Sequence, residues 1–128
     1  MADVAARLRE TAARLPDHTA VVWQHQHLSY RELDQRVDAA AGGLQHLGVE
    51  PGDRVAIVCG NVPAFVEAYF ATHRCGAAAV PLHPDLTPDE LRYVLADSGA
   101  RVCIAMASVA DLLAPLTGEL EQLAALVA

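Results

Sequence analysis

The clearest periodic pattern in the chain begins at Ser29. Apolar residues then recur at the spacing of one helix face: Leu33, Val37, Ala40, Leu44 and Leu47. Ser29 and Glu32 form the pattern of a capping box, in which the serine hydroxyl accepts a hydrogen bond from the glutamate N–H and the glutamate side chain reaches back to the cap. Gly48 readily adopts the left-handed conformation that ends many helices. The pattern predicts a helix from Ser29 to Gly48.

Two further helices are indicated on either side of this one. Val4 to Leu15 is rich in Ala and Arg and stops at Pro16, which predicts a short surface helix. Pro63 begins a second helical run that Gly76 closes. Its apolar face is expected to contain Val62, Phe65, Val66, Tyr69, Phe70 and His73.

The second half of the chain has two more helical patterns. Thr87 followed by Pro88, Asp89 and Glu90 predicts a capped helix start, and Ser98-Gly99 predicts its end. Beyond Ser108, two leucine-rich stretches divided near 115–118 predict one broken helix or two short helices.

Strands are expected between these helices. Thr19–Trp23 predicts a strand, which a turn over 24–27 joins to a short return strand at Leu28. After a Pro-Gly turn, the run from Arg54 to Cys59 is apolar on both faces, as in a central parallel strand covered on both sides. The runs 77–82 and 101–105 predict two more buried strands. The alternation of helix and strand predicts an α/β fold, a mainly parallel sheet flanked by helices, with 1–128 as one unit.

Composition excludes several classes of function. A formal net charge of −7 gives no basic surface for nucleic acid. No apolar run is long enough to span a membrane and the start does not resemble a secretory signal, so we expect a cytoplasmic protein. The cysteines, Cys59, Cys75 and Cys103, stand singly in apolar surroundings and are expected to be reduced and buried. All nine basic residues are Arg, which excludes any lysine of a phosphate loop, Schiff base or general acid.

Several ordered blocks resemble the N-terminal part of the AMP-binding, adenylate-forming superfamily, which includes acyl-CoA synthetases and the adenylation domains of peptide synthetases. The resemblance covers 16–105, and its blocks are 28–33, 48–57, 61–68, 74–84, 86–91 and 97–101. Cys59-Gly60 and Val62 depart from the family pattern, which leaves Asn61 as the expected helix cap, and His83 stands where relatives often have Asn. The fold implied is therefore a partial domain, an incomplete N-terminal subdomain of a truncated enzyme.

The resemblance implies an ATP-dependent acid–thiol ligase. Such enzymes convert a carboxylic acid, as in fatty acid metabolism, to an acyl-adenylate and then transfer it to CoA or to the phosphopantetheine of a carrier protein, with ATP and Mg as cofactors. Their Ser/Thr/Gly-rich phosphate loop, ribose-binding acid and C-terminal lysine have no counterpart in this chain. We therefore assign no catalytic, cofactor-binding or metal residue here, and we expect no activity from the chain alone.

Other polar or small residues could be given roles, and each has a structural explanation. His25 with His27, and His73 with Cys75, could be metal ligands, but a hairpin turn and a helix end explain them. The remaining residues considered are Asp34, Asp38, Arg74, Arg92, Gly42 and Gly43. The two aspartates are expected on a solvated helix face, the arginines could approach an acyl or CoA group in a complete enzyme, and the glycines are expected to permit close packing.

Three hypotheses about partners remain open at this point. The chain could need the remainder of an adenylating enzyme, or it could associate with itself through an exposed apolar face. It could be a non-catalytic interaction or dimerisation module derived from such an enzyme. It could also be a small α/β domain that binds a nucleotide at the carboxyl ends of its strands.

Overall fold

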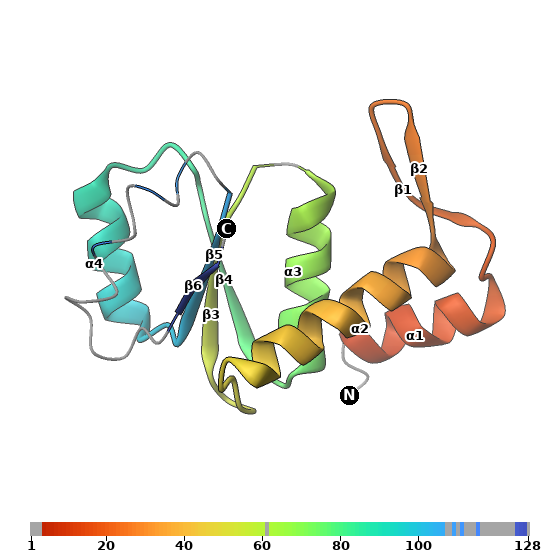
Figure 1. Ribbon diagram of the computed structural model, residues 1–128, viewed down its shortest axis with the longest axis horizontal. Helices are drawn as coiled ribbons and strands as arrows, with labels where there is room; N and C mark the ends of the chain where they lie inside the picture. The colour runs from red at the N-terminus through yellow and green to blue at the C-terminus, as the bar shows by residue number, and fades with distance from the viewer. Residues whose placement is uncertain are drawn as a thin grey trace.

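A computed structural model describes residues 4–60, 62–106, 109, 111, 115 and 125–127. The elements along the chain are α1 (Val4–Arg14), β1 (Thr19–Trp23), β2 (Gln26–Ser29), α2 (Tyr30–His46), β3 (Arg54–Val58), α3 (Pro63–Arg74), β4 (Ala78–Leu82), α4 (Pro88–Ser98), β5 (Val102–Ala105) and β6 (Ala125–Val127) (Figure 1). The order and type of the elements from α1 to β5 match those expected from the sequence.

The main sheet has the strand order β4-β3-β5-β6, and every pairing in it is parallel. β3 lies between β4 and β5, with Val55 opposite both Ala79 and Val102. Its residues Val55–Val58 are completely buried, because alternate side chains face helices on opposite sides of the sheet. The predicted α/β class and the central position of this strand are confirmed.

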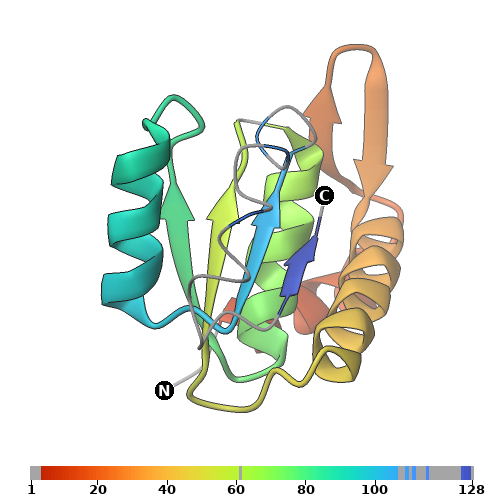
Figure 2. The ribbon, with the colours of Figure 1, turned by 60° about the vertical axis from the view of Figure 1, so that its left-hand side comes forward.

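The helices form layers on the two faces of this sheet (Figure 2). α4 covers one face, where Leu91 and Leu95 pack against the side chains of β3 and β5. α2 and α3 cover the other face, and α1 lies against both of these helices. The β1–β2 hairpin stands apart from the main sheet and projects beyond α2 (Figure 1).

The helix ends follow the local chemistry of the sequence. The Glu32 N–H donates to the Ser29 hydroxyl and the Ser29 N–H donates to the Glu32 carboxylate, both at 3.1 Å, so the predicted capping box is present. Thr87 and Glu90 form a second capping box at the start of α4. Gly48 follows α2 with a φ of 95°, and Gly99 ends α4 in the left-handed conformation.

The hairpin differs slightly from the prediction. The return strand begins at Gln26 rather than at Leu28, so the turn contains only Gln24 and His25. Gln24 adopts a φ of 54°, a left-handed conformation that such a tight turn requires. The polar character of 24–27 therefore reflects an exposed hairpin tip rather than a longer turn.

The expected apolar face of α3 is not its most buried face. Ala68, Ala71 and Thr72 are the buried residues of this helix. The small side chains let α3 pack closely between the sheet and α2, and the Thr72 hydroxyl is satisfied by donating to the Ala68 carbonyl at 2.8 Å. The large residues of the predicted face are only half-buried and form a row in which the Tyr69 ring contacts the rings of Phe65, Phe70 and His73.

The end of the chain also differs from the prediction. Residues 125–127, expected in the second leucine-rich helix, form strand β6, which pairs with β5. The unpaired edge of β5 offers hydrogen bonds along its whole length, and such pairing overrides a helical side-chain pattern. The other residues of the two predicted helices after Ser108, and Asn61 as the expected cap of α3, lie outside the described residues apart from isolated positions. The N-cap of α3 is Val62, which makes no side-chain capping bond.

Candidate functional site

The sheet has a topological switch point between β3 and β5. The chain leaves β3 for β4 on one side, and then crosses over to β5 on the other side. Open parallel sheets bind ligands in the crevice that such a reversal leaves at the carboxyl ends of the strands. A groove of about 370 Å³ lies at this point, beside the ends of β3 and β5 and between α2 and α3.

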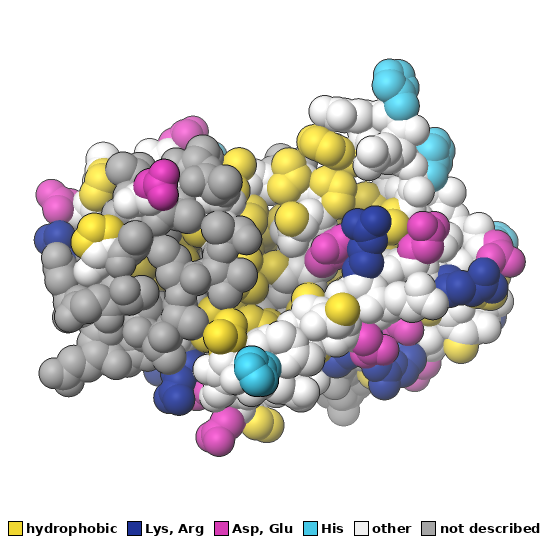
Figure 3. Space-filling model, in the orientation of Figure 1, with side chains coloured by type: hydrophobic (Ala, Val, Ile, Leu, Met, Phe, Trp, Pro, Cys, Tyr) yellow, Lys and Arg dark blue, Asp and Glu magenta, His cyan; other side chains and the backbone are white. Residues whose placement is uncertain are grey.

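We call this feature the α2–α3 groove. It is lined by Ala40, Gly43, Leu44, Leu47, Cys59, Ala64, Glu67, Ala68, Ile104, Ala105 and Met106. Figure 3 shows hydrophobic side chains gathered in the middle of the face that carries α2. Part of the apolar stripe predicted on α2 thus opens onto the groove, and Leu47 remains 36% exposed there.

The groove has little electrostatic character. Glu67 is the one described lining residue that carries a charge, and its carboxylate lies 3.1 Å from the guanidinium of Arg36. No cation is among the described lining residues, so a phosphate would meet a carboxylate and methyl groups instead of the donors that it requires. The surface is therefore suited to an uncharged, apolar group.

The described part of the chain does not show the close packing expected at the two glycines of α2. Gly42 and Gly43 are exposed, and a Cβ atom built on either would have nothing within 4 Å among the described atoms. Gly43 lies at the rim of the α2–α3 groove. Close packing therefore does not explain these residues within the described part of the chain, although each weakens an exposed helix.

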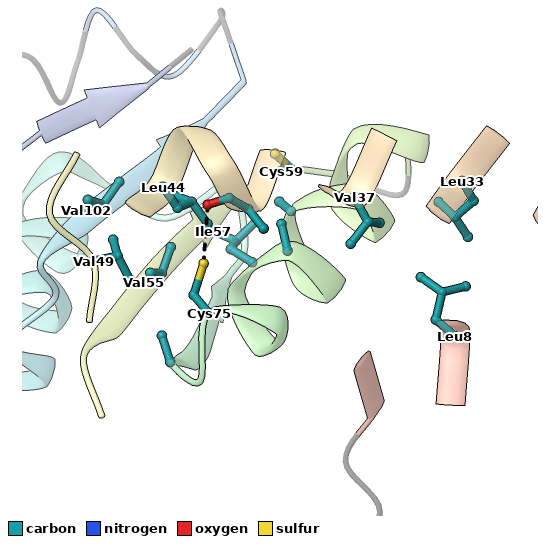
Figure 4. Close-up of a cluster of buried hydrophobic side chains, with 14 of the residues drawn as sticks. Leu8, Leu33, Val37, Leu44, Val49, Val55, Ile57, Cys59, Cys75 and Val102 are labelled. Atoms are coloured by element: carbon teal, nitrogen blue, oxygen red, sulfur yellow. Dashed lines mark hydrogen bonds between the residues drawn. The ribbon is translucent and has the colours of Figure 1, made fainter. Parts of the chain in front are cut away.

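The three cysteines are free thiols in the interior, as predicted. Burial raises the pKa of the Cys59 and Cys75 thiols, and burial together with the neighbouring Cys59 raises the pKa of Cys103 to about 12. The Cys75 thiol points from the end of α3 toward α2 and donates to the Ala41 carbonyl at 3.5 Å (Figure 4). Thiols of this kind remain protonated near neutral pH and are poor nucleophiles.

Asp34, Asp38 and Arg74 form an ion-pair cluster between helices. The Arg74 guanidinium lies 2.8 Å from Asp34 and 2.9 Å from Asp38, and Asp38 also pairs with Arg9 of α1 at 2.7 Å. The expected solvated face holds for Asp38, which is 54% exposed, but not for Asp34, which Arg74 covers from α3. The guanidinium of Arg74 is already occupied, so it does not extend toward a ligand.

His25, His27, His73 and Arg92 form no cluster with one another in the described part of the chain. His25 and His27 are exposed on the hairpin, whereas the His73 ring packs edge-on against Tyr69 with centroids 4.6 Å apart. Arg92 is largely exposed and lies 3.7 Å from the Asp89 carboxylate. Over the described residues, no three His, Cys, Asp or Glu side chains gather as they would around a metal ion. In the same part of the chain, no helix has the length and apolar character needed to cross a membrane.

Comparison with known proteins identifies the fold. The model of the AMP-binding enzyme family matches residues 8–127. The chain belongs to this family. The match extends beyond the region that carries the resemblance in the sequence motifs and includes strand β6.

Relatives within the AMP-binding family include both kinds of adenylating enzyme. The chain is 46% identical over 105 residues to a feruloyl-CoA synthase from Amycolatopsis. The aligned region covers 81% of this chain and 21% of the relative. It is 36% identical over 95 residues to tyrocidine synthase 2 from Brevibacillus parabrevis, covering 74% of this chain and 3% of the relative. The chain thus spans about a fifth of the synthase and far less of the peptide synthetase.

Solved structures show the same correspondence. A long-chain-fatty-acid CoA ligase from Rhodopseudomonas palustris is 31% identical, with a TM-score of 0.89 over 98% of this chain and 32% of its own. The N-terminal subdomain of NpsA from Klebsiella oxytoca is 30% identical, with a TM-score of 0.77 over 82% of this chain and 28% of its own. The chain corresponds to the N-terminal region of an AMP-binding enzyme.

Proposed function

We propose that the chain is the N-terminal part of a ligase that activates a carboxylic acid with ATP. The acid would displace pyrophosphate to give an acyl-adenylate, and the acyl group would then pass to the thiol of CoA or of a carrier protein. Family membership supports this proposal, as do relatives named as a feruloyl-CoA synthase and as a peptide synthetase.

Within that enzyme, we assign this segment a structural role. A carboxylate and a triphosphate repel each other, so adenylation needs cations and N–H donors aimed at the phosphates. The observation that carries the proposal is the chemistry of the α2–α3 groove, whose one charged described lining residue is the carboxylate of Glu67. The absence of lysine from the sequence points the same way. ATP, Mg and the acceptor thiol would therefore be held by residues outside this chain.

Pyrophosphate exchange tests both parts of the proposal. The 128-residue protein and a chimera, in which residues 1–127 replace the matching start of the Amycolatopsis feruloyl-CoA synthase, would each be assayed with ATP and ferulate. We expect exchange from the chimera and none from the isolated chain. Carboxylate-dependent exchange by the isolated chain would contradict the structural role, and a folded but inactive chimera would contradict membership of a functional ligase.

A further inference from the structure

The α2–α3 groove has the character of a protein interface. We propose that it is the surface on which the remaining part of the adenylating enzyme docks, by inserting an apolar segment from the region that follows the matched residues. This inference rests on the function proposed above, and it specifies which face of the chain the rest of the enzyme covers.

The chemistry of the groove favours an apolar protein segment over a charged ligand. Leu47 on α2, Ile104 on β5 and Met106 just after β5 line the groove with aliphatic side chains, and the Glu67 carboxylate is already paired with Arg36. Apolar side chains gain free energy by leaving water on such a surface, whereas a phosphate or a free carboxylate would lose hydration without finding a cation.

Leu47 and Gly43 show how the segment could fit. Leu47 caps α2 and keeps over a third of its surface exposed, although four other apolar residues of this helix are buried in the core. Gly43 lies one turn earlier, and no atom of the described residues occupies the position where its side chain would stand. Together they leave an apolar contact beside a bare stretch of helix, to which another backbone could approach closely.

The size of the related structures supports the remainder of the enzyme as the occupant. The R. palustris ligase superimposes on 98% of this chain, yet the superposition covers only 32% of the ligase. About two thirds of that enzyme must therefore pack outside the unit described here. The groove lies at the carboxyl edge of the sheet, where folds of this kind bind their ligands. We therefore expect the remainder of the enzyme to pack against this edge.

The test uses the isolated chain and the feruloyl-CoA synthase chimera described above. Leu47→Glu places a carboxylate in the groove, and Val4→Glu is the matched control. Val4 is 37% exposed against 36% for Leu47, and it precedes the residues that match the family model. Thermal unfolding and pyrophosphate exchange would be measured for each protein, and sedimentation would report the oligomeric state of the isolated chain.

We expect Leu47→Glu to lower the melting temperature of the chimera by at least about 5 °C, because an unpaired charge would be buried. The same change should shift the isolated chain by less than about 3 °C, and Val4→Glu should leave both proteins nearly unchanged. A Leu47→Glu chimera as stable as its parent would overturn the proposal. So would an unsubstituted chimera that fails to fold, because the groove would then not accept the rest of a relative.

Other outcomes distinguish this docking surface from a dimer interface and from the proposed function. If the isolated chain is a dimer that Leu47→Glu dissociates, while the chimera does not respond, the groove binds a second copy and the proposal fails. An active chimera that does not respond to Leu47→Glu overturns the docking surface and leaves the proposed function intact. A chimera that Leu47→Glu destabilises but that lacks exchange activity supports the docking surface and contradicts the proposed function.

Discussion

The guanidinium of Arg74, at the end of α3, lies 2.8 Å from the carboxylate of Asp34 on α2. The two side chains are 11% and 22% exposed, so water screens their attraction only partly. Arg74 also donates to the Ala5 carbonyl of α1 at 3.5 Å. One side chain thus connects the three helices that form a single side of the molecule.

Removing the carboxylate of Asp34 should destabilise the chain. Asp34→Ala leaves a largely buried cation with Asp38 as its remaining charged partner, and we expect the free energy of unfolding to fall by about 2 kcal/mol. Asp17→Ala, which breaks an exposed pair with Arg31, should cost at most about 0.5 kcal/mol. Urea denaturation compares the two variants, and equal losses would show that Arg74 contributes no more than a surface ion pair.

The capping boxes should make the free energy of unfolding depend on pH in the acidic range. The hydrogen bond from the Ser29 backbone N–H holds the pKa of Glu32 below its ordinary value of 4.5, and Thr87 acts in the same way on Glu90. The folded chain therefore binds these protons less readily than the unfolded chain. The stabilisation is complete above pH 4.5 and is lost as the pH falls through the lowered values.

Substitution of the cap residues checks this account. Ser29→Ala and Thr87→Ala should each lower the free energy of unfolding by about 1 kcal/mol. The double variant Glu32→Gln with Glu90→Gln should show a smaller loss of stability between about pH 6 and about pH 3 than the parent chain. An unchanged pH dependence in urea denaturation would argue against a contribution from these carboxylates.

The exposed glycines of α2 predict variants that stabilise the isolated chain. Gly42→Ala and Gly43→Ala should each raise the free energy of unfolding by about 0.5 to 1 kcal/mol, since alanine is the better helix former and the added methyl group contacts no atom of the described residues. Gly99→Ala is the opposite case, because φ is 66° and the added Cβ would lie 2.7 Å from the Arg54 guanidinium. The melting temperature should rise for Gly42→Ala and Gly43→Ala and fall for Gly99→Ala.

The thiols should be protected in the folded chain. Because burial raises the pKa values of Cys59, Cys75 and Cys103, little thiolate forms near neutral pH. We expect a thiol-specific reagent to label the native protein at least about tenfold more slowly than the urea-unfolded protein. Rapid labelling of Cys59 alone, located by mass spectrometry, would mean that the α2–α3 groove exposes its thiol more than the structure shows.

Local sequence chemistry predicts those parts of the fold in which the residues of one element determine its structure. Ser29 and Glu32 predict the start of α2 because their capping bonds lie within a single turn. Val55–Val58 predict the central strand because this short apolar run, which follows a Pro-Gly turn, is typical of a strand covered on both faces. These signals depend little on the rest of the chain.

Features that depend on distant segments were missed. The leucine-rich end gave no indication of β6, which exists through its pairing with β5. The row of large residues on α3 concealed the fact that Ala68 and Ala71 form the tightly packed face. The α2–α3 groove could not be predicted either, because its walls come from two helices, from β5 and from the residue that follows β3, which are far apart in the sequence.

Isothermal titration of Mg-ATP into the isolated 128-residue protein, with AMP as a second ligand, tests most directly the claim that this chain supplies structure and no nucleotide chemistry. The account predicts no saturable heat for either nucleotide, together with clear binding by the feruloyl-CoA synthase chimera under the same conditions. Saturable binding of ATP or AMP by the isolated chain would contradict it, and would instead support a nucleotide site at the carboxyl edge of the sheet.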